Sequence, residues 1–142
     1  MITYPIIFEG SAEASQGMKT NWEVEASGFK EMCAVPVEFE GQGGSFSPED
    51  FFLLALENCF VATFKVFSEY SKLTFEKLKI NSKLVVDKDP AGSPMMSKID
   101  FDITLTGVSD EKRALLLVKK TLENGFILRS VKTEITHTIN IN

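Results

Sequence analysis

The fold is decided by the stretch Ser47-Pro48-Glu49-Asp50-Phe51-Phe52-Leu53-Leu54-Ala55-Leu56-Glu57-Asn58-Cys59-Phe60-Val61-Ala62-Thr63-Phe64. Ser47 is a favoured N-cap residue, and Pro48 suits the first helical position, where its missing N–H would have no partner. The two carboxylates that follow face the positive end of the helix dipole. Nearly every side of the segment beyond them is apolar, which is typical of a helix buried around most of its circumference. The pattern predicts a long central helix from about Pro48 to Ser71.

Cys59 lies in the middle of this apolar helix. A thiol in such a place is either inert core filling or a nucleophile in a hydrophobic pocket. The helix dipole acts only over the first turn, so a nucleophilic Cys59 needs a cation from elsewhere. Glu49 lies about 15 Å from Cys59 along the helix axis, so the two side chains of one chain cannot touch. Glu49 therefore either complements the dipole or acts from a second subunit or through an intermediary residue.

Composition narrows the class of protein. The 142 residues predict a single domain over 1–142, and the 44% of hydrophobic residues, with twelve Phe, predict a substantial core. A net charge of −5 without a Lys/Arg cluster argues against a nucleic-acid or acidic-membrane partner. No charge-free apolar run reaches the length of a membrane span, and the start Met1-Ile2-Thr3-Tyr4-Pro5 does not resemble a signal peptide. Two cysteines then predict free thiols in the cytoplasm.

The remaining pattern predicts an α+β fold. Period-two apolar spacing predicts strands, and a second helix begins near Ser109-Asp110-Glu111 and ends at Asn124-Gly125. Each sheet is expected to bury one face against helices, with the Cys59 helix at the centre. The predicted strands are Ile2 to Phe8, Met18 to Val24, Phe29 to Phe39, Leu78 to Val86, Ile99 to Leu105 and Val131 to Ile141.

The central segment resembles the osmotically inducible protein C / organic hydroperoxide resistance (OsmC/Ohr) family. Its members carry a Pro-Glu pair at the start of a central helix and a reactive cysteine ten residues beyond the Glu. Glu49 and Cys59 keep that spacing, and the Gly-rich lead-in Gly41 to Ser47 also fits. The resemblance implies antiparallel sheets packed around a long central helix, in an intertwined homodimer.

The resemblance also implies a chemistry. In the family the cysteine attacks an organic hydroperoxide, a second cysteine resolves the sulfenic acid as a disulfide, and an Arg/Glu pair helps to activate the thiol. Cys59 and Glu49 match the cysteine and the Glu, whereas the N-terminal strands here contain no arginine. Lys19 in that region and Arg129 beside the turn after the second helix are the candidates for a thiolate-stabilising cation. The second cysteine is also missing, with Gly125 or a neighbour in its place.

Other motifs point to structural roles. Cys33 shares strand parity with Val35 and Val37, so we expect it to face the core rather than resolve a sulfenic acid. One histidine, His137, and two distant cysteines do not supply the four ligands of a structural zinc site, so no metal and no cofactor are expected. The Gly41 to Gly44 loop lacks the Lys-Ser/Thr of a phosphate-binding loop.

Two functions remain open. The first is a thiol-dependent organic hydroperoxide reductase of a peroxiredoxin-like kind, acting in oxidative stress defence, in which an external thiol resolves the oxidised Cys59. The second is a non-catalytic OsmC-like dimer that binds a small apolar ligand among its phenylalanine side chains. A cation near Cys59 in the folded dimer would favour the first, because thiolate character controls peroxide reactivity.

Overall fold

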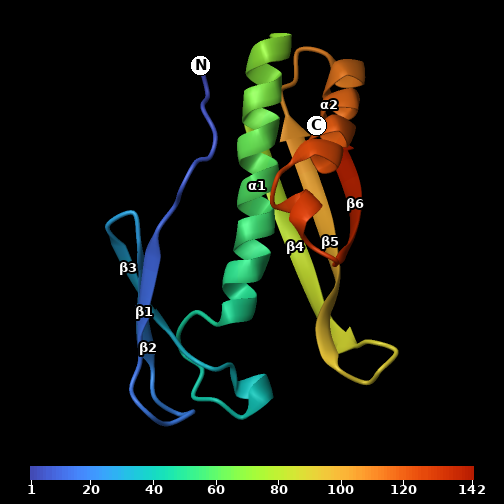
Figure 1. Ribbon diagram of the computed structural model, residues 1–142. Helices are drawn as coiled ribbons and strands as arrows, with labels where there is room; N and C mark the ends of the chain where they lie inside the picture. Colours follow the sequence, from blue (N-terminus) through green and yellow to red (C-terminus); the bar gives the residue numbers. More distant parts are fainter. The chain divides into compact units, whose positions relative to one another are not determined.

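The computed structural model describes residues 1–142, which divide into two compact units, Met1–Phe52 and Leu53–Asn142. The first unit holds the three-stranded sheet β1-β2-β3, and the second holds the sheet β4-β5-β6 and the helix α2 (Figure 1). The helix α1 begins in the first unit and continues into the second. The strands are β1 Gly10–Glu13, β2 Trp22–Ala26, β3 Phe29–Cys33, β4 Lys77–Lys88, β5 Pro94–Thr106 and β6 Glu134–Ile141.

Helix α1 spans Pro48–Ser71, the range that the sequence predicted. The expected N-cap is formed: the Asp50 N–H donates to Ser47 Oγ at 3.1 Å, and the Ser47 N–H donates to Asp50 Oδ2 at 2.9 Å. This reciprocal pair is a capping box, which satisfies two backbone donors at the helix start. The loop before it also needs its glycine, since a Cβ on Gly41 would lie 2.1 Å from the Val35 carbonyl oxygen.

Helix α1 is long and apolar enough to cross a membrane by length and composition, with a mean hydropathy of 1.5 over its most apolar window. The core helix of a soluble protein has the same character. The charged residues Glu57 and Lys65 interrupt the apolar sequence of the helix. Glu57 accepts a hydrogen bond from Ser82 Oγ on β4. Because a charged side chain of the helix is hydrogen-bonded to the neighbouring sheet, we interpret α1 as the central helix of a soluble fold.

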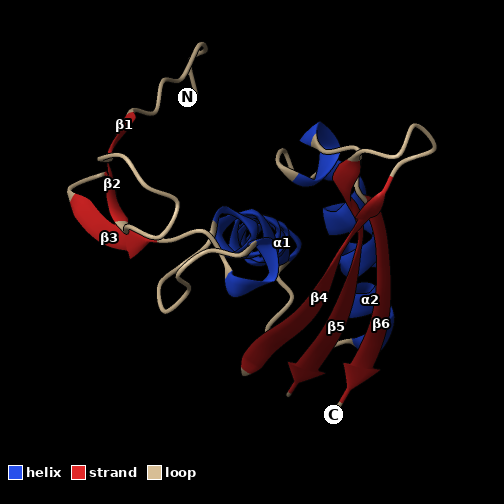
Figure 2. Ribbon diagram, turned by 90° about the horizontal axis from the view of Figure 1, so that it is seen from below, coloured by secondary structure: helices blue, strands red, loops and turns tan.

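The core of the second unit lies on one face of its sheet. Alternate β5 residues, from Ile99 to Leu105, are fully buried, and Phe60 of α1 meets Phe101 at a ring-centroid distance of 6.2 Å. Helix α2, Glu111–Asn124, lies beside β5 and β6 (Figure 2), and its buried face includes Leu117. Alternation along β5 therefore decides which face of the sheet the helices cover.

The sheet β4-β5-β6 is mixed, which corrects the expectation of purely antiparallel sheets. β4 and β5 form an antiparallel hairpin, whereas β6 lies parallel to β5, with Ile99 opposite Ile135. The reason is the connection, because α2 carries the chain back to the starting end of β5 before β6 begins. Parallel neighbours require such a crossover, and a helix usually supplies it. Asp110 caps α2 by accepting the Arg113 N–H at 3.0 Å.

The first unit departs most from the sequence prediction. Residues 2–8 form no strand and are exposed, and β1 begins only at Gly10. β3 ends at Cys33, and a 3₁₀ turn, η1, follows at Val37–Phe39. The sheet β1-β2-β3 does not bury one face as expected, because nearly all of its residues are exposed or half-buried. The unit contains apolar side chains that it does not cover itself.

Candidate active site

Cys59 is a free thiol on α1 and is 8% exposed. Its neighbours Leu56 and Phe60 on the same helix are fully buried. The helix therefore positions the sulfur rigidly at the edge of the packed core of the second unit. Cys59 is slightly less completely buried than these two neighbours.

The turn after α2 covers the Cys59 sulfur. An ideal Cβ built on Gly125 would lie 3.0 Å from Cys59 Sγ and 2.9 Å from Leu128 Cδ1. Gly125 has φ −60° and ψ 129°, a conformation that any residue adopts, so its backbone does not require glycine. The position requires glycine because the sulfur and the leucine occupy the space of a side chain. The resemblance placed Gly125 or a neighbour where the family has its second cysteine, and Gly125 is the residue of this turn that lies against the Cys59 sulfur.

The two arginines have different surroundings. Arg129 lies in the 3₁₀ turn η2, Leu128–Ser130, and its backbone N–H donates to the Gly125 carbonyl at 2.9 Å. It thus belongs to the turn that covers Cys59, and its side chain is exposed and forms no ion pair with an acidic side chain.

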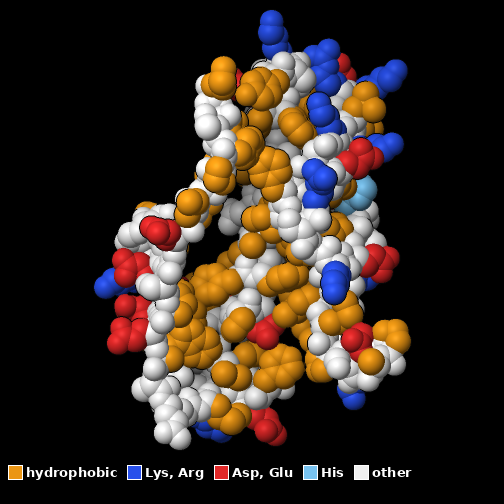
Figure 3. All heavy atoms as spheres, in the orientation of Figure 1, with side chains coloured by type: hydrophobic (Ala, Val, Ile, Leu, Met, Phe, Trp, Pro, Cys, Tyr) orange, Lys and Arg blue, Asp and Glu red, His pale blue; other side chains and the backbone are white.

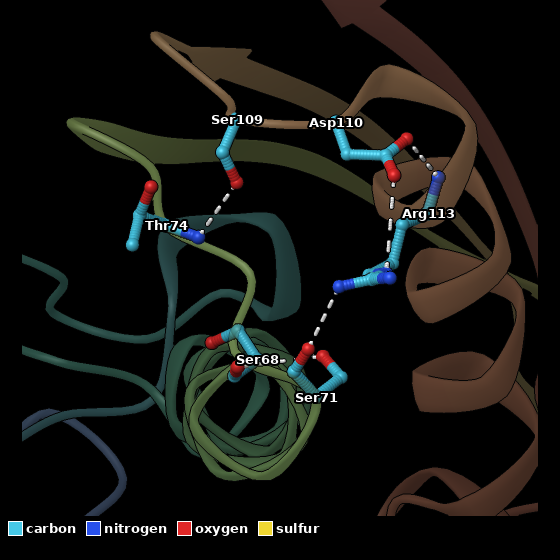
Figure 4. Close-up of polar contacts among 6 residues, drawn as sticks. All are labelled: Ser68, Ser71, Thr74, Ser109, Asp110 and Arg113. Atoms are coloured by element: carbon cyan, nitrogen blue, oxygen red, sulfur yellow. Dashed lines mark hydrogen bonds and ion pairs between the residues drawn. The ribbon is translucent and has the colours of Figure 1, made fainter.

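Arg113 has a structural role. Its Nη1 donates to the Ser71 carbonyl at 3.0 Å, and its Nε lies 3.9 Å from Asp110 Oδ2 (Figure 4). Ser71 ends α1, twelve residues or roughly 18 Å from Cys59 along the helix axis. The guanidinium therefore caps the carboxyl end of α1, where a cation complements the helix dipole. Arg113 is therefore engaged far from the thiol, and Arg129 is the arginine whose backbone belongs to the turn over Cys59.

Glu49 and Lys19 both lie in the first unit. Glu49 is half-buried at the start of α1, and its Oε2 atom is buried without a hydrogen-bond partner. Lys19 lies exposed in the loop between β1 and β2 and forms no ion pair. The two predicted site residues are therefore not paired with each other. A buried, unpartnered carboxylate oxygen is costly, so Glu49 has an unmet requirement for a donor.

Sequence reasoning missed one polar residue of the central helix. Glu57 lies two positions before Cys59, and Ser82 Oγ on the inward face of β4 donates to its carboxylate. Two positions along a helix correspond to about 200° of rotation, so Glu57 and Cys59 point to different flanks of α1. Glu57 therefore links α1 to the sheet. The sequence did contain a signal for Glu57, because it is the only charged residue between Asp50 and Lys65.

Cys33 faces the core, as predicted. It ends β3 opposite Trp22 and is 2% exposed. Burial raises the pKa of the Cys33 thiol, because the thiolate would lose its hydration, and the nearby Glu31 carboxylate raises it further. A thiol held in its neutral form is a poor nucleophile. His137 is exposed on β6, and no group of three His, Cys, Asp or Glu side chains is arranged to hold a metal ion.

The first unit also contains an apolar cavity of about 560 Å³. The rings of Phe46 and Phe51 on its wall are tilted against each other at a centroid distance of 5.3 Å, and Phe29 on β3 is 79% exposed. The cavity is lined by Val24, Glu25, Ala26, Phe29, Lys30, Glu31, Phe46 and Phe51. Its size is within the range of small-molecule sites, and its lining suits an apolar ligand.

The fold and the buried thiol define a class of protein: an α+β protein with a free cysteine on its central helix. Residues 41–140 match the model of the OsmC-like protein family, and the chain belongs to that family. No curated protein matches the chain in sequence.

Solved structures show the same fold. An OsmC-like protein of Vibrio cholerae is 19% identical, with a TM-score of 0.81 over 96% of this chain and 100% of that one. The OsmC-like protein of Mycoplasma pneumoniae is 13% identical, with a TM-score of 0.82 over 97% and 99%. The organic hydroperoxide resistance protein OhrB of Bacillus subtilis is 14% identical, with a TM-score of 0.65 over 96% and 98%. At these sequence identities, the similarity to the solved structures shows that the fold is shared.

Proposed function

We propose that this protein is a cytoplasmic thiol-dependent organic hydroperoxide reductase of oxidative stress defence, with Cys59 as the nucleophile. The observation that carries the proposal is the site of the sulfur, on the central helix of an OsmC-like fold and under the Gly125 turn. Structural neighbours named as organic hydroperoxide resistance proteins support it. Arg129 on the covering turn is the cation proposed to stabilise the thiolate, and Lys19 is the alternative.

The proposed first step transfers one oxygen atom. The Cys59 thiolate attacks the outer oxygen of the hydroperoxide, the O–O bond breaks, and the organic part leaves as an alkoxide that takes up a proton to become an alcohol. The sulfur is oxidised to sulfenic acid and the peroxide is reduced. An apolar surrounding such as that of Leu56 and Phe60 suits an organic rather than a small polar peroxide.

The second step requires a thiol from outside the chain. Cys33 is buried in the first unit and held neutral, and the chain has no third cysteine. An external thiol therefore displaces the sulfenic hydroxyl as water and forms a mixed disulfide with Cys59. A second equivalent of that thiol releases Cys59 and leaves as its own disulfide.

The oxidation products test this proposal. One equivalent of cumene hydroperoxide should add a single oxygen to Cys59, trapped by dimedone in mass spectrometry, because no internal thiol is available to remove it. Excess peroxide should drive Cys59 on to sulfinic acid, with Cys33 unchanged. A loss of two hydrogens with a Cys33–Cys59 cross-link would contradict this and would make Cys33 the resolving thiol.

We also propose that the active protein is a homodimer. Only 28% of the most apolar window of α1 is buried within the chain, and hydrophobic side chains lie on the surface over α1 (Figure 3). Residues 1–52 contain nine acidic and two basic side chains, which gives a net charge of −7. Residues 53–142 contain eleven acidic and thirteen basic side chains, which gives a net charge of +2. Apolar surface and opposite charge favour association of two copies. Glu49, with its unpartnered oxygen, would then find its donor in the second copy.

Sedimentation velocity at micromolar concentration should give twice the chain mass of 15.8 kDa. We expect the dimer interface to include residues 41–52. Phe51→Asp should therefore shift the protein toward monomer, because association would bury the charge of the new carboxylate. Phe126→Asp is the matched control, since Phe126 is exposed and lies outside this region. A monomeric wild-type protein would exclude the dimer.

A second function is favoured by the apolar cavity of the first unit. In this alternative the protein is a non-catalytic dimer that binds a small apolar ligand between Phe29, Phe46 and Phe51. Fluorescent fatty-acid binding that is kept in Cys59→Ser and lost in Phe46→Asp would favour it. Hydroperoxide consumption that depends on Cys59 favours the first function.

A further inference from the structure

Helix α2 has two faces with the same residue spacing, and only one of them packs on the sheet. The buried face consists of residues at i, i+3, i+4 and i+7, namely Ala114, Leu117, Val118 and Thr121. A second set with this spacing begins two positions earlier, about 200° around the helix: Lys112, Leu115, Leu116 and Lys119. All four are exposed, with Leu115 at 47% and Leu116 at 61%. We call this exposed face the α2 surface.

Positive charge is concentrated around the α2 surface. Residues 111–132 contain six Lys or Arg and two Glu, a net charge of +4 in a chain of net charge −5. Lys112 and Lys119 each lie one helical turn from the exposed leucines, and neither forms an ion pair. In Figure 3, Lys and Arg side chains gather at the upper right, where Figure 1 places α2, with hydrophobic side chains among them. The negative charge of the whole chain therefore does not describe this surface.

The chain that follows α2 continues this combination of side chains. Phe126 and Ile127 are 74% and 42% exposed, and the exposed cations Arg129 and Lys132 come shortly after them. Glu123 is the only acidic residue between Glu111 and Glu134. Exposed apolar side chains are thus accompanied by cations both on the helix and in the segment beyond it.

We propose that the α2 surface is a docking site for an anionic lipid bilayer, on which α2 lies parallel to the membrane plane. The inference goes beyond the proposed function and does not depend on Cys59. Leu115 and Leu116 enter the boundary between the head groups and the acyl chains. The lysines beside them bury their methylene stems and keep their ammonium groups among the lipid phosphates. Each such cation adds to the attraction of the negative membrane surface.

The mixture of side chains favours lipid over other anionic partners. A nucleic acid backbone pairs with lysine but leaves two exposed leucines without an apolar partner. The outer face of a helix is convex, so an acidic protein would need a groove shaped to receive it. A fluid bilayer adapts to a convex face and accommodates leucine and lysine at neighbouring depths. An anionic bilayer therefore satisfies both the charge and the apolar character of this surface.

Flotation of the full chain with lipid vesicles tests the docking site. Wild type should bind vesicles of roughly one-third phosphatidylglycerol in phosphatidylcholine at least about tenfold more strongly than pure phosphatidylcholine vesicles. Lys112→Glu combined with Lys119→Glu should weaken binding to the mixed vesicles at least about tenfold, because it reverses the charge beside the leucines. A folded wild-type protein that does not bind the mixed vesicles would overturn the proposal.

The matched control places the same charge change elsewhere on the second unit. Lys79 and Lys83 are exposed on β4, on the face of the sheet opposite to the buried side chains that the helices cover. Lys79→Glu combined with Lys83→Glu should keep vesicle binding within about twofold of the wild type, because distant charges are screened. Equal losses in the two double variants would mean that net charge alone governs binding, and would also overturn the proposal.

Replacing the leucines distinguishes a bilayer from an acidic protein. Leu115→Ser combined with Leu116→Ser keeps every charge and should weaken vesicle binding at least about tenfold, with folding checked by circular dichroism. Unchanged vesicle binding in this variant, together with wild-type binding to polyglutamate as tight as to the mixed vesicles, would assign the surface to an acidic protein instead. Sedimentation velocity separates the remaining occupant, a second copy of the chain. If Lys112→Glu with Lys119→Glu converted a dimer into monomers, the surface would be a contact between copies and the proposal would fail.

Discussion

Replacing Cys59 with serine should lower organic hydroperoxide consumption at least about a hundredfold, equivalent to about 2.7 kcal/mol of transition-state stabilisation. Serine keeps the shape of the side chain but removes the sulfur that accepts the oxygen atom. Its hydroxyl is not a nucleophile without an adjacent base. The measurement is the loss of cumene hydroperoxide over time with excess glutathione, at equal protein concentration.

Cys33→Ser is the matched control, because it removes the other thiol of the chain. Its consumption rate should stay close to that of the wild type, since Cys33 is buried and burial raises its pKa. Equal rates for wild type and Cys59→Ser would reject the reductase and favour the apolar-ligand function. A loss of activity in Cys33→Ser alone would mean that the reactive thiol is Cys33, in the first unit.

Replacing Phe60 with alanine should lower the free energy of unfolding by about 3–5 kcal/mol, the range for buried phenylalanine. Phe60 is fully buried on α1, and its ring lies 6.0 Å from that of Phe64 and 6.2 Å from that of Phe101. The substitution leaves a cavity between the central helix and β5, where the second unit is most tightly packed. Chemical denaturation followed by circular dichroism measures the change.

Phe126→Ala is the control for this loss. Phe126 is 74% exposed, so its truncation should change the free energy of unfolding by less than about 0.5 kcal/mol. A Phe60→Ala variant with nearly unchanged stability would mean that α1 does not pack against the sheet as described. Because Cys59 directly precedes Phe60 on α1, the same variant should also lower peroxide consumption, since the position of the thiol would be less well fixed.

The central helix is the part of the fold that could be predicted most closely. The cap residues around Ser47 and the apolar length of α1 act locally, so the range Pro48–Ser71 follows from adjacent residues alone. The hairpin of β4 and β5 follows for the same reason, from period-two alternation on both sides of a turn. Cys59 as a candidate nucleophile came from the resemblance to the OsmC/Ohr family, which its spacing to Glu49 supports.

Other features depend on contacts between distant segments. The parallel pairing of β6 with β5 depends on how α2 crosses the sheet, and alternation within one strand contains no information about its partner's direction. The apolar pattern of residues 2–8 resembles a strand, yet a strand needs a partner to satisfy its backbone, and this segment has none within the chain.

The sequence by itself determined the central helix, its cap and the α+β class, because each depends on neighbouring residues and their periodicity. It made Cys59 the candidate thiol through the resemblance to the OsmC/Ohr family. Only the tertiary structure decided what covers that thiol. Residues 59 and 125 are 66 positions apart, and nothing in a glycine after a helix indicates which side chain it will face. The folded chain places the Gly125 α-carbon against Cys59 Sγ, because α1 and the end of α2 pack on the same face of one sheet.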